Sequence, residues 1–142
     1  MALTRLLCIL GSLELASAAH AEIAVIVNAG LPVRSMTTQQ VAELYLGRTR
    51  SFESNQYALI FDRPGDDPLR ERFFRAATSM SPAQVNAFWS RLKFTGRVQP
   101  PQPLPGDAAT IDMVGRNPNA IGYIGATTVT DPQVRIVLIL HE

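Results

Sequence analysis

The chain is poor in the residues that most enzymes use for catalysis. It has one cysteine and two histidines in 142 residues. Cys8 and His20 lie in an N-terminal stretch that we expect to be removed, which leaves His141 beside the end of the chain. A chain without cysteine forms no disulfide and has no thiol nucleophile, and one terminal histidine gives little support to a serine–histidine mechanism. Because G-x-S-x-G, HExxH, P-loop and G-x-G-x-x-G motifs are also absent, we expect a protein that is not an enzyme.

An excess of charge of either sign is also lacking. Thirteen Lys and Arg stand against twelve Asp and Glu, so the net charge is +1. That balance gives no reason to expect nucleic acid or an anionic membrane as the partner. Three aspartates gather near one turn, but they lack the spacing of a calcium loop and no bidentate glutamate follows. We therefore expect no metal ion and no other cofactor.

No apolar run is long enough to span a membrane, and the first residues have the order of a signal peptide. Arg5 supplies the positive charge, residues 6–13 the apolar core, and residues 19–21 the small residues of a cleavage site. A buried N-terminal helix is the alternative. The run is too short for a membrane span, so we expect no membrane anchor. The sequence predicts a cleaved signal peptide over 1–21, one domain over 22–142 and a periplasmic location.

Apolar runs alternate with amphipathic segments along the rest of the chain. Strands are predicted at 23–27, 57–61, 120–124 and 134–140. The first run is apolar throughout, which is typical of a strand covered on both faces, as in a parallel sheet. Helices are predicted after the caps Thr37 or Thr38, Asp67, Ser81 and Asp107. This alternation predicts a three-layer α/β domain with a mixed, mainly parallel sheet of about four to five strands.

Two helices have apolar stripes with helical spacing. In the helix that begins at Pro68, the stripe predicts that Leu69, Phe73 and Ala77 face inward. The arginines of this helix are expected to face mainly outward: Arg70, Arg72 and Arg75. The helix after Ser81 carries a core stripe that includes Trp89. The segment 95–106 is rich in Pro and Gly and is predicted to be neither helix nor central strand.

The turn over residues 62–69 is the candidate anion site. It connects an apolar strand, through a Pro-Gly turn, to a helix capped by Asp67. Free backbone N–H groups and the positive end of the helix dipole point at such a turn, and Arg63 lies beside it. Ordinary helix capping is the alternative. Asp66 and Asp67 would repel a phosphate unless Arg63 or Arg70 compensates.

Other polar residues are candidates for the same ligand. Asn28 and Ser35 follow the first strand, and ligands in open α/β sheets lie off the carboxyl ends of strands. We therefore expect Asn28 to converge with Arg63. A second loop offers a hydroxyl, a flexible backbone and a guanidinium: Thr95, Gly96 and Arg97. A merely solvated arginine is the alternative for that loop.

Four segments resemble the phosphate-type periplasmic binding proteins, which are the substrate-binding components of phosphate ABC transporters. Residues 36–48 resemble that family's L-T-x-x-Q-(L/V)-x-x-I-F-x-G-K segment, and residues 118–124 resemble its P-G-A-I-G-Y-V. Residues 94–101 are similar to the F-T-G-(K/R)-x-Q-P-P of small stand-alone members. Residues 62–71 lie where the family carries R-S-D-x-S-G-T-R-E. The matches come in the family's order.

The resemblance implies one lobe of a type II periplasmic binding protein and an oxyanion ligand such as phosphate. Arg63 takes the place of the family's phosphate-binding arginine, and Asp67 falls on its binding serine. Pro68 and Leu69 fall on the family's Gly-Thr pair, so of this set only the arginine is kept. A carboxylate in place of a hydroxyl removes a hydrogen bond and adds repulsion, and Pro68 removes a backbone N–H.

Two functions stay open at this stage. The first is a solute-binding module for phosphate or a similar oxyanion, associated with or derived from a phosphate ABC transporter. The second is a protein-interaction or sensory scaffold with a degenerate ligand site, with a membrane transporter or sensor protein as the partner. A single lobe either binds weakly, is completed by a second subunit as in a homodimer, or no longer binds phosphate. The expected ligand-binding residues are Arg63, Asp67, Leu69, Arg70, Asn28, Ser35, Thr95, Gly96 and Arg97.

Overall fold

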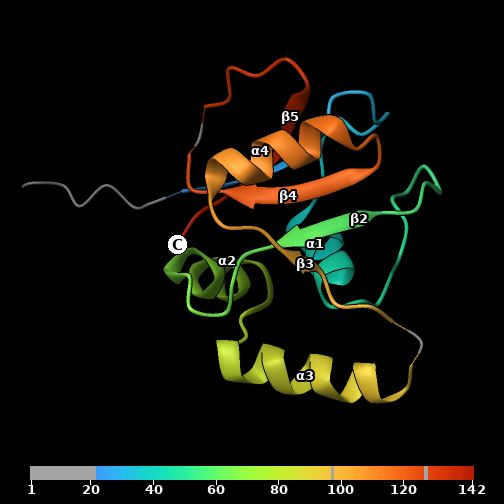
Figure 1. The fold of residues 1–142 in the computed structure, drawn as a ribbon, viewed down its shortest axis with the longest axis vertical. Coiled ribbons are helices and arrows are strands. Elements are labelled where there is room, and N and C mark those ends of the chain that lie inside the picture. The colour runs from blue at the N-terminus through green and yellow to red at the C-terminus, as the bar shows by residue number, and fades with distance from the viewer. Residues whose placement is uncertain (1–21, 97, 127) are drawn as a thin grey trace, which may run out of the picture.

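The computed structural model describes residues 22–142 except positions 97 and 127 (Figure 1). The predicted signal peptide and Arg97 lie outside the described residues. The described part contains five strands and four helices: β1 (Ile23–Asn28), α1 (Thr38–Tyr45), β2 (Leu59–Asp62), α2 (Pro68–Thr78), α3 (Pro82–Phe94), β3 (Gln102–Pro103), α4 (Asp107–Arg116), β4 (Ala120–Ile124) and β5 (Val134–Leu140).

The strands form one mixed sheet in the order β3-β2-β4-β1-β5. β2 is parallel to both of its neighbours, β3 and β4. β1 is antiparallel to both of its neighbours, β4 and β5, so it runs against the other four strands. The predicted α/β sheet is confirmed, whereas the parallel setting expected for β1 is wrong. A continuous apolar run indicates that both faces of a strand are buried, but it does not indicate the direction of the strand. Both faces of β1 are buried here, although its pairing is antiparallel.

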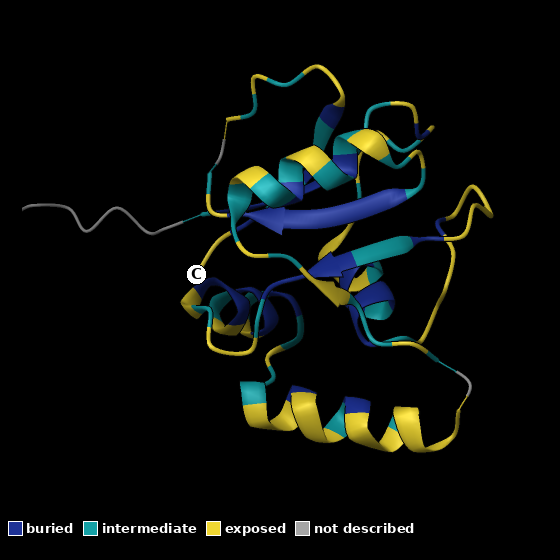
Figure 2. Cartoon of the chain, viewed as in Figure 1, coloured by how far each residue is buried: buried dark blue, intermediate teal, exposed yellow. Residues whose placement is uncertain are grey.

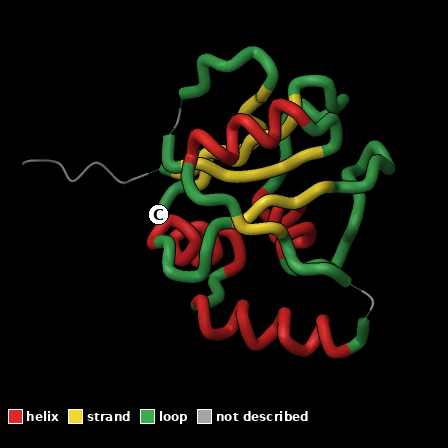
Figure 3. The backbone as a smooth tube through the Cα atoms, viewed as in Figure 1, coloured by secondary structure: helices red, strands yellow, loops and turns green. Residues whose placement is uncertain are grey.

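Helices cover both faces of the sheet, which gives three layers (Figures 1 and 3). α4 packs on one face, where Val114 meets Ala24 and Ile26 of β1. α1 and α2 pack on the other face, where their side chains meet Val25 and Val27 of β1. Because successive side chains of a strand point to opposite faces, β1 contributes to both cores, and all of it except the half-buried Asn28 is buried.

Helix α1 begins and ends as its sequence predicts. Thr37 caps it, and Gln40 completes a capping box with Thr37. Gly47, one residue beyond the C-cap, has a φ of +66°, a conformation that favours glycine. A Cβ on Gly47 would lie 2.8 Å from the Cη2 atom of Trp89. The tight fit between α1 and α3 therefore depends on glycine at this position.

Helix α3 lies at the periphery and buries few of its side chains (Figures 1 and 2). Of its predicted stripe, Val85 and Trp89 are buried, whereas Phe88 and Leu92 are only partly buried. The indole Nε1 of Trp89 donates a hydrogen bond to the carbonyl of Tyr45 over 3.1 Å. This bond attaches α3 to α1.

The proline-rich crossing and α4 lie where they were predicted, but the cap predicted for α4 is wrong by one residue. Among the described residues of the crossing, only the two of β3 form a strand, and β3 lies at the edge of the sheet. Asp107, expected as the cap of the next helix, is its first residue, and Gly106 is the cap. None of the helices in residues 22–142, positions 97 and 127 apart, is long and apolar enough to cross a membrane.

Candidate functional site

The candidate site lies where the parallel strands β2 and β4 end. The turn over 62–69 follows β2 and starts α2, and Gly125 follows β4. Because β2 and β4 are parallel neighbours, both ends reach the same edge of the sheet. Asp107, at the start of α4, joins them there by accepting hydrogen bonds from Gly125 and Arg63. We call residues 62–70 with Asp107 and Gly125 the Arg63 corner.

A buried carboxylate, Asp62, organises the base of the Arg63 corner. Its Oδ1 accepts hydrogen bonds from the hydroxyl of Tyr123 and, over 2.7 Å, from the backbone N–H of Arg63. Its Oδ2 accepts one from Nε of Arg70 over 3.0 Å. Burial raises the pKa of the Tyr123 phenol, and the charge of Asp62 raises it further, so the phenol remains a neutral donor.

Arg70 is buried, and the prediction that it faces mainly outward is wrong. Its side chain is 10% exposed and forms an ion pair with Asp62. Its guanidinium also lies 4.9 Å from the ring centre of Phe74. The helical spacing alone left Arg70 near the boundary of the apolar stripe, and the buried partner on β2 draws it inward. Arg75, in contrast, is exposed and pairs with Glu71 over 2.9 Å, as predicted.

Arg63 is buried between two carboxylates. Its side chain is 5% exposed. Nη1 donates to Oδ2 of Asp67 over 3.2 Å, and Nη2 donates to Oδ1 of Asp107. Nη2 also lies 3.4 Å from the carbonyl oxygen of Tyr123. Both terminal nitrogens of the predicted anion-binding guanidinium are therefore engaged within the chain.

Two backbone N–H groups of the Arg63 corner are engaged by the same carboxylates. The N–H of Leu69, at the start of α2, donates to Oδ1 of Asp67 over 2.9 Å. The N–H of Gly125 donates to both oxygens of Asp107, over 3.1 and 3.2 Å. A guanidinium and backbone N–H groups, above all those at a helix start such as Leu69, are donors that oxyanions bind. Here Asp67 and Asp107 hold all three.

Negative charge exceeds positive charge among the groups that contact one another in the Arg63 corner. Three carboxylates, those of Asp62, Asp67 and Asp107, face two guanidiniums, those of Arg63 and Arg70. With all five groups charged, their net charge is −1. An incoming anion would thus meet local repulsion as well as occupied donors.

An open hollow of about 720 Å³ lies beside the Arg63 corner. Its lining includes Arg63 and Arg70 and, from α3, Trp89 and Lys93. Prolines of the crossing complete the wall: Pro100, Pro101, Pro103 and Pro105. Two buried guanidinium nitrogens, Nε of Arg63 and Nη1 of Arg70, have no hydrogen-bond partner among the described residues.

Asn28 and Ser35 do not join the Arg63 corner. Because β1 is antiparallel to β4, Asn28 lies at the opposite edge of the sheet from Arg63. Its Nδ2 donates to the carbonyls of Val114 and Gly115 over 3.0 and 3.1 Å and so holds the end of α4. The expected convergence of Asn28 with Arg63 is therefore wrong, whereas a binding role for either residue stays a prediction.

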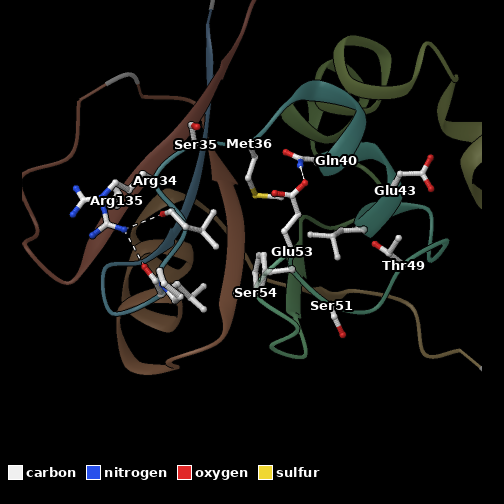
Figure 4. A pocket seen from close by; sticks show the side chains of 15 residues that line it. Arg34, Ser35, Met36, Gln40, Glu43, Thr49, Ser51, Glu53, Ser54 and Arg135 are labelled. Atoms are coloured by element: carbon white, nitrogen blue, oxygen red, sulfur yellow. Dashed lines mark hydrogen bonds between the residues drawn. The ribbon is translucent and has the colours of Figure 1, made fainter.

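Ser35 borders a second hollow, of about 700 Å³, on the α1 side of the molecule (Figure 4). Arg135 of β5 holds one wall by donating to the carbonyls of Leu31 and Val33 over 3.1 and 2.9 Å. Gln40 donates to Glu53 over 2.5 Å across another part of the rim. Here the side chains of Arg135 and Gln40 form hydrogen bonds within the protein. This hollow therefore lacks the donors of the Arg63 corner, which are the Arg63 guanidinium and the N–H groups of Leu69 and Gly125.

Thr95 and Gly96 end α3 rather than border the hollow beside Arg63. The hydroxyl of Thr95 donates to the carbonyl of Leu92 over 2.6 Å, and Gly96 has a φ of +67°. These are ordinary features of a helix C-terminus. Arg97, the third residue of that predicted loop, lies outside the described residues.

Asp107 and Gly125 were not predicted as site residues. The sequence indicates a helix start at Asp107 and the end of a strand before Gly125. Asp107 lies 44 residues from Arg63, and only the packing of α4 on the sheet brings the two together. The described residues contain no group of three or more Asp, Glu, His or Cys placed to hold a metal ion.

Comparison with protein-family models finds no match, and comparison with curated proteins finds none either. Solved structures do match. The chain aligns with a protein from Clostridium perfringens, assigned as a phosphate ABC transporter substrate-binding protein and solved with bound phosphate, at a TM-score of 0.64 and 22% identity. It aligns with an ABC-type phosphate transport receptor from Vibrio cholerae at 0.63 and 19%, and with a protein from Planctomyces limnophilus assigned to phosphate binding at 0.61 and 11%.

These alignments cover 82% of this chain but only 45%, 46% and 41% of the three neighbours, so the chain spans less than half of their length. At such identities the likeness concerns the fold. The fold of this chain is that of a single lobe of phosphate substrate-binding proteins.

Proposed function

We propose that the chain is a periplasmic solute-binding module of the phosphate-receptor type, with phosphate or a related oxyanion as its ligand at the Arg63 corner. One observation carries this proposal: the fold brings three donors of the kind that oxyanions bind, the guanidinium of Arg63 and the N–H groups of Leu69 and Gly125, together at the ends of β2 and β4. The module acts by binding and not by catalysis.

The chemistry of these donors supports an oxyanion over a neutral solute. Guanidinium groups match the geometry of carboxylate and phosphate oxygens, and N–H groups at a helix start favour negative charge. In this structure the acceptors of these donors are two carboxylates of the protein itself, those of Asp67 and Asp107. The bound phosphate of the Clostridium perfringens neighbour supports the same ligand class.

A single lobe offers one wall of a binding site. A second surface is needed to enclose the ligand and exclude water, and it comes either from a second copy of this chain or from a membrane transporter or sensor protein. We therefore expect weak phosphate binding by the isolated chain.

A second candidate function is a protein-interaction or sensory module whose anion site is closed. The observation that favours it is the occupation of all three donors by Asp67 and Asp107. In this case the lobe is retained for its contacts with a protein partner, and phosphate has no effect on its stability.

Thermal unfolding of the purified protein in a phosphate series distinguishes the two candidates. If the first holds, phosphate at about a hundred times its dissociation constant stabilises the fold by roughly 2.7 kcal/mol. Sulfate forms the second arm, since a rise with sulfate alone identifies a different oxyanion. No rise with either anion supports the closed module.

Two arginine variants locate any response. Arg63→Ala should abolish the rise, and each variant is compared with its own phosphate-free baseline because Arg63 is buried. Arg75→Ala is the matched control, since Arg75 lies on the exposed side of α2 and pairs only weakly with Glu71. An unchanged response in Arg63→Ala would move the site elsewhere.

A further inference from the structure

We infer that Asp107 competes with an incoming oxyanion for the donors of the Arg63 corner, because its carboxylate already accepts their hydrogen bonds. This inference rests on the proposed function only in treating the Arg63 corner as the ligand site. One oxygen of Asp107 accepts from Nη2 of Arg63, and both of its oxygens accept from the N–H of Gly125. A bound oxyanion would need these same two donors.

Asp107 reaches Arg63 from a different helix, α4, and not from the turn over residues 62–69. The other carboxylate, Asp67, belongs to the turn itself and caps α2 through the N–H of Leu69. Asp107 comes from α4, 44 residues along the chain from Arg63. Its side chain is 41% exposed, against 24% for Asp67. Asp107 is therefore the carboxylate that an incoming ligand can displace into water.

The start of α4 does not need the carboxylate of Asp107. The N-cap is Gly106, which has no side chain to donate or accept. The first turn is closed by Thr110, whose N–H and hydroxyl both donate to the carbonyl of Gly106, over 3.1 and 2.8 Å. Displacement of the Asp107 side chain thus leaves the helix start in place, with only a weakened dipole interaction.

Removal of Asp107 also changes the charge of the corner. The contacting groups sum to −1 with Asp107 and to zero without it, because Asp62 and Asp67 then balance Arg63 and Arg70. Nη2 of Arg63 and the N–H of Gly125 are left without their carboxylate acceptor. Vacant donors and a lower negative charge both favour an oxyanion.

The test compares phosphate binding by the native protein and by Asp107→Ala, with thermal unfolding and with the amide signal of Gly125 in NMR spectra. We expect the variant to bind phosphate at least tenfold more tightly, which corresponds to about 1.4 kcal/mol. The Gly125 amide signal should shift when phosphate is added to the variant. Asp107→Asn is the second variant, since it removes the charge and keeps the size.

Asp112→Ala is the matched control. It removes the same charge from the same helix, but Asp112 is exposed and pairs with Arg116 over 2.8 Å. Tighter binding in Asp107→Ala and unchanged binding in Asp112→Ala support the inference.

The outcomes separate this inference from the proposed function. Equal phosphate binding by the native protein and Asp107→Ala overturns the inference and leaves the proposed function in place. Binding by the variant alone supports the inference and overturns phosphate binding as the native function. An absence of binding in both, or binding without a shift of the Gly125 amide signal, overturns the inference.

Discussion

Replacement of Asp62 by asparagine should destabilise the fold more than any exposed charge change. The two oxygens of Asp62 accept hydrogen bonds from three donors: the hydroxyl of Tyr123, the N–H of Arg63 and Nε of Arg70. An asparagine has one oxygen and one NH₂ group, so in either orientation an N–H donor faces another donor. Arg70 is also left as a buried cation without its counter-charge.

The size of the effect follows from the burial of the pair. The side chains of Arg70 and Asp62 are 10% and 7% exposed, so solvent replaces little of the lost interaction. Removal of one partner of a buried ion pair costs about 3–5 kcal/mol. Because small domains are stable by about 5–15 kcal/mol in total, Asp62→Asn should lose a large fraction of the free energy of unfolding.

Urea unfolding followed by circular dichroism measures this loss. With a denaturant slope of about 2 kcal/mol/M, the midpoint should fall by roughly 2 M. Glu71→Gln is the matched control, because it removes an exposed carboxylate from α2, the helix that carries Arg70, and should cost about 0.5 kcal/mol or less. A midpoint for Asp62→Asn equal to that of Glu71→Gln would refute the reasoning.

Two further predictions concern the packing of α1 and the buried phenols. Gly47→Ala should lower the free energy of unfolding by at least about 1–2 kcal/mol, since φ is +66° and the new Cβ would lie 2.8 Å from Trp89. Gly65→Ala is the control: its new Cβ meets no atom within 4 Å, so it should lower the free energy of unfolding less in the same urea assay. Burial raises the pKa of Tyr45 and Tyr123, and the charge of Asp62 raises both further. Above the ordinary tyrosine pKa of about 10, the unfolded chain loses these protons while the folded chain keeps them, so the free energy of unfolding should fall by up to about 1.4 kcal/mol per pH unit for each phenol. Urea midpoints that stay constant between about pH 9 and 11 would contradict this second prediction.

The local features of this fold are predictable from sequence because each depends on a few adjacent residues. The caps Thr37, Asp67 and Ser81 were each indicated by a polar residue in front of an amphipathic segment, and each accepts the expected backbone N–H. Four of the five strands in the described part of the chain were indicated by apolar runs, whereas the two-residue β3 was not predicted. The position of Arg63 at the end of β2 followed from the same local pattern.

The features that decide the chemistry depend on contacts between distant residues. The direction of β1 is set by its partners β4 and β5, and an apolar run carries no direction. The burial of Arg70 requires Asp62 across the turn. The ion pair between Arg63 and Asp107 forms only because the start of α4 and the end of β2 lie next to each other. The sequence therefore located the arginine but not the carboxylate that neutralises it.

The loop that Arg135 holds has a consequence for aggregation. β5 is an edge strand of seven residues, six of them apolar, and strands of this kind readily pair with other chains. Arg135 binds three carbonyls of residues 29–33, and Met36 then donates its N–H to the carbonyl of Val137 over 2.9 Å. The loop over residues 29–36 is thus hydrogen-bonded to β5, and the opposite edge strand, β3, has only two residues, one of them Pro103. Neither edge therefore offers a long strand for pairing with another chain. Release of the loop from β5 would expose a long apolar edge strand and make the chain prone to self-association.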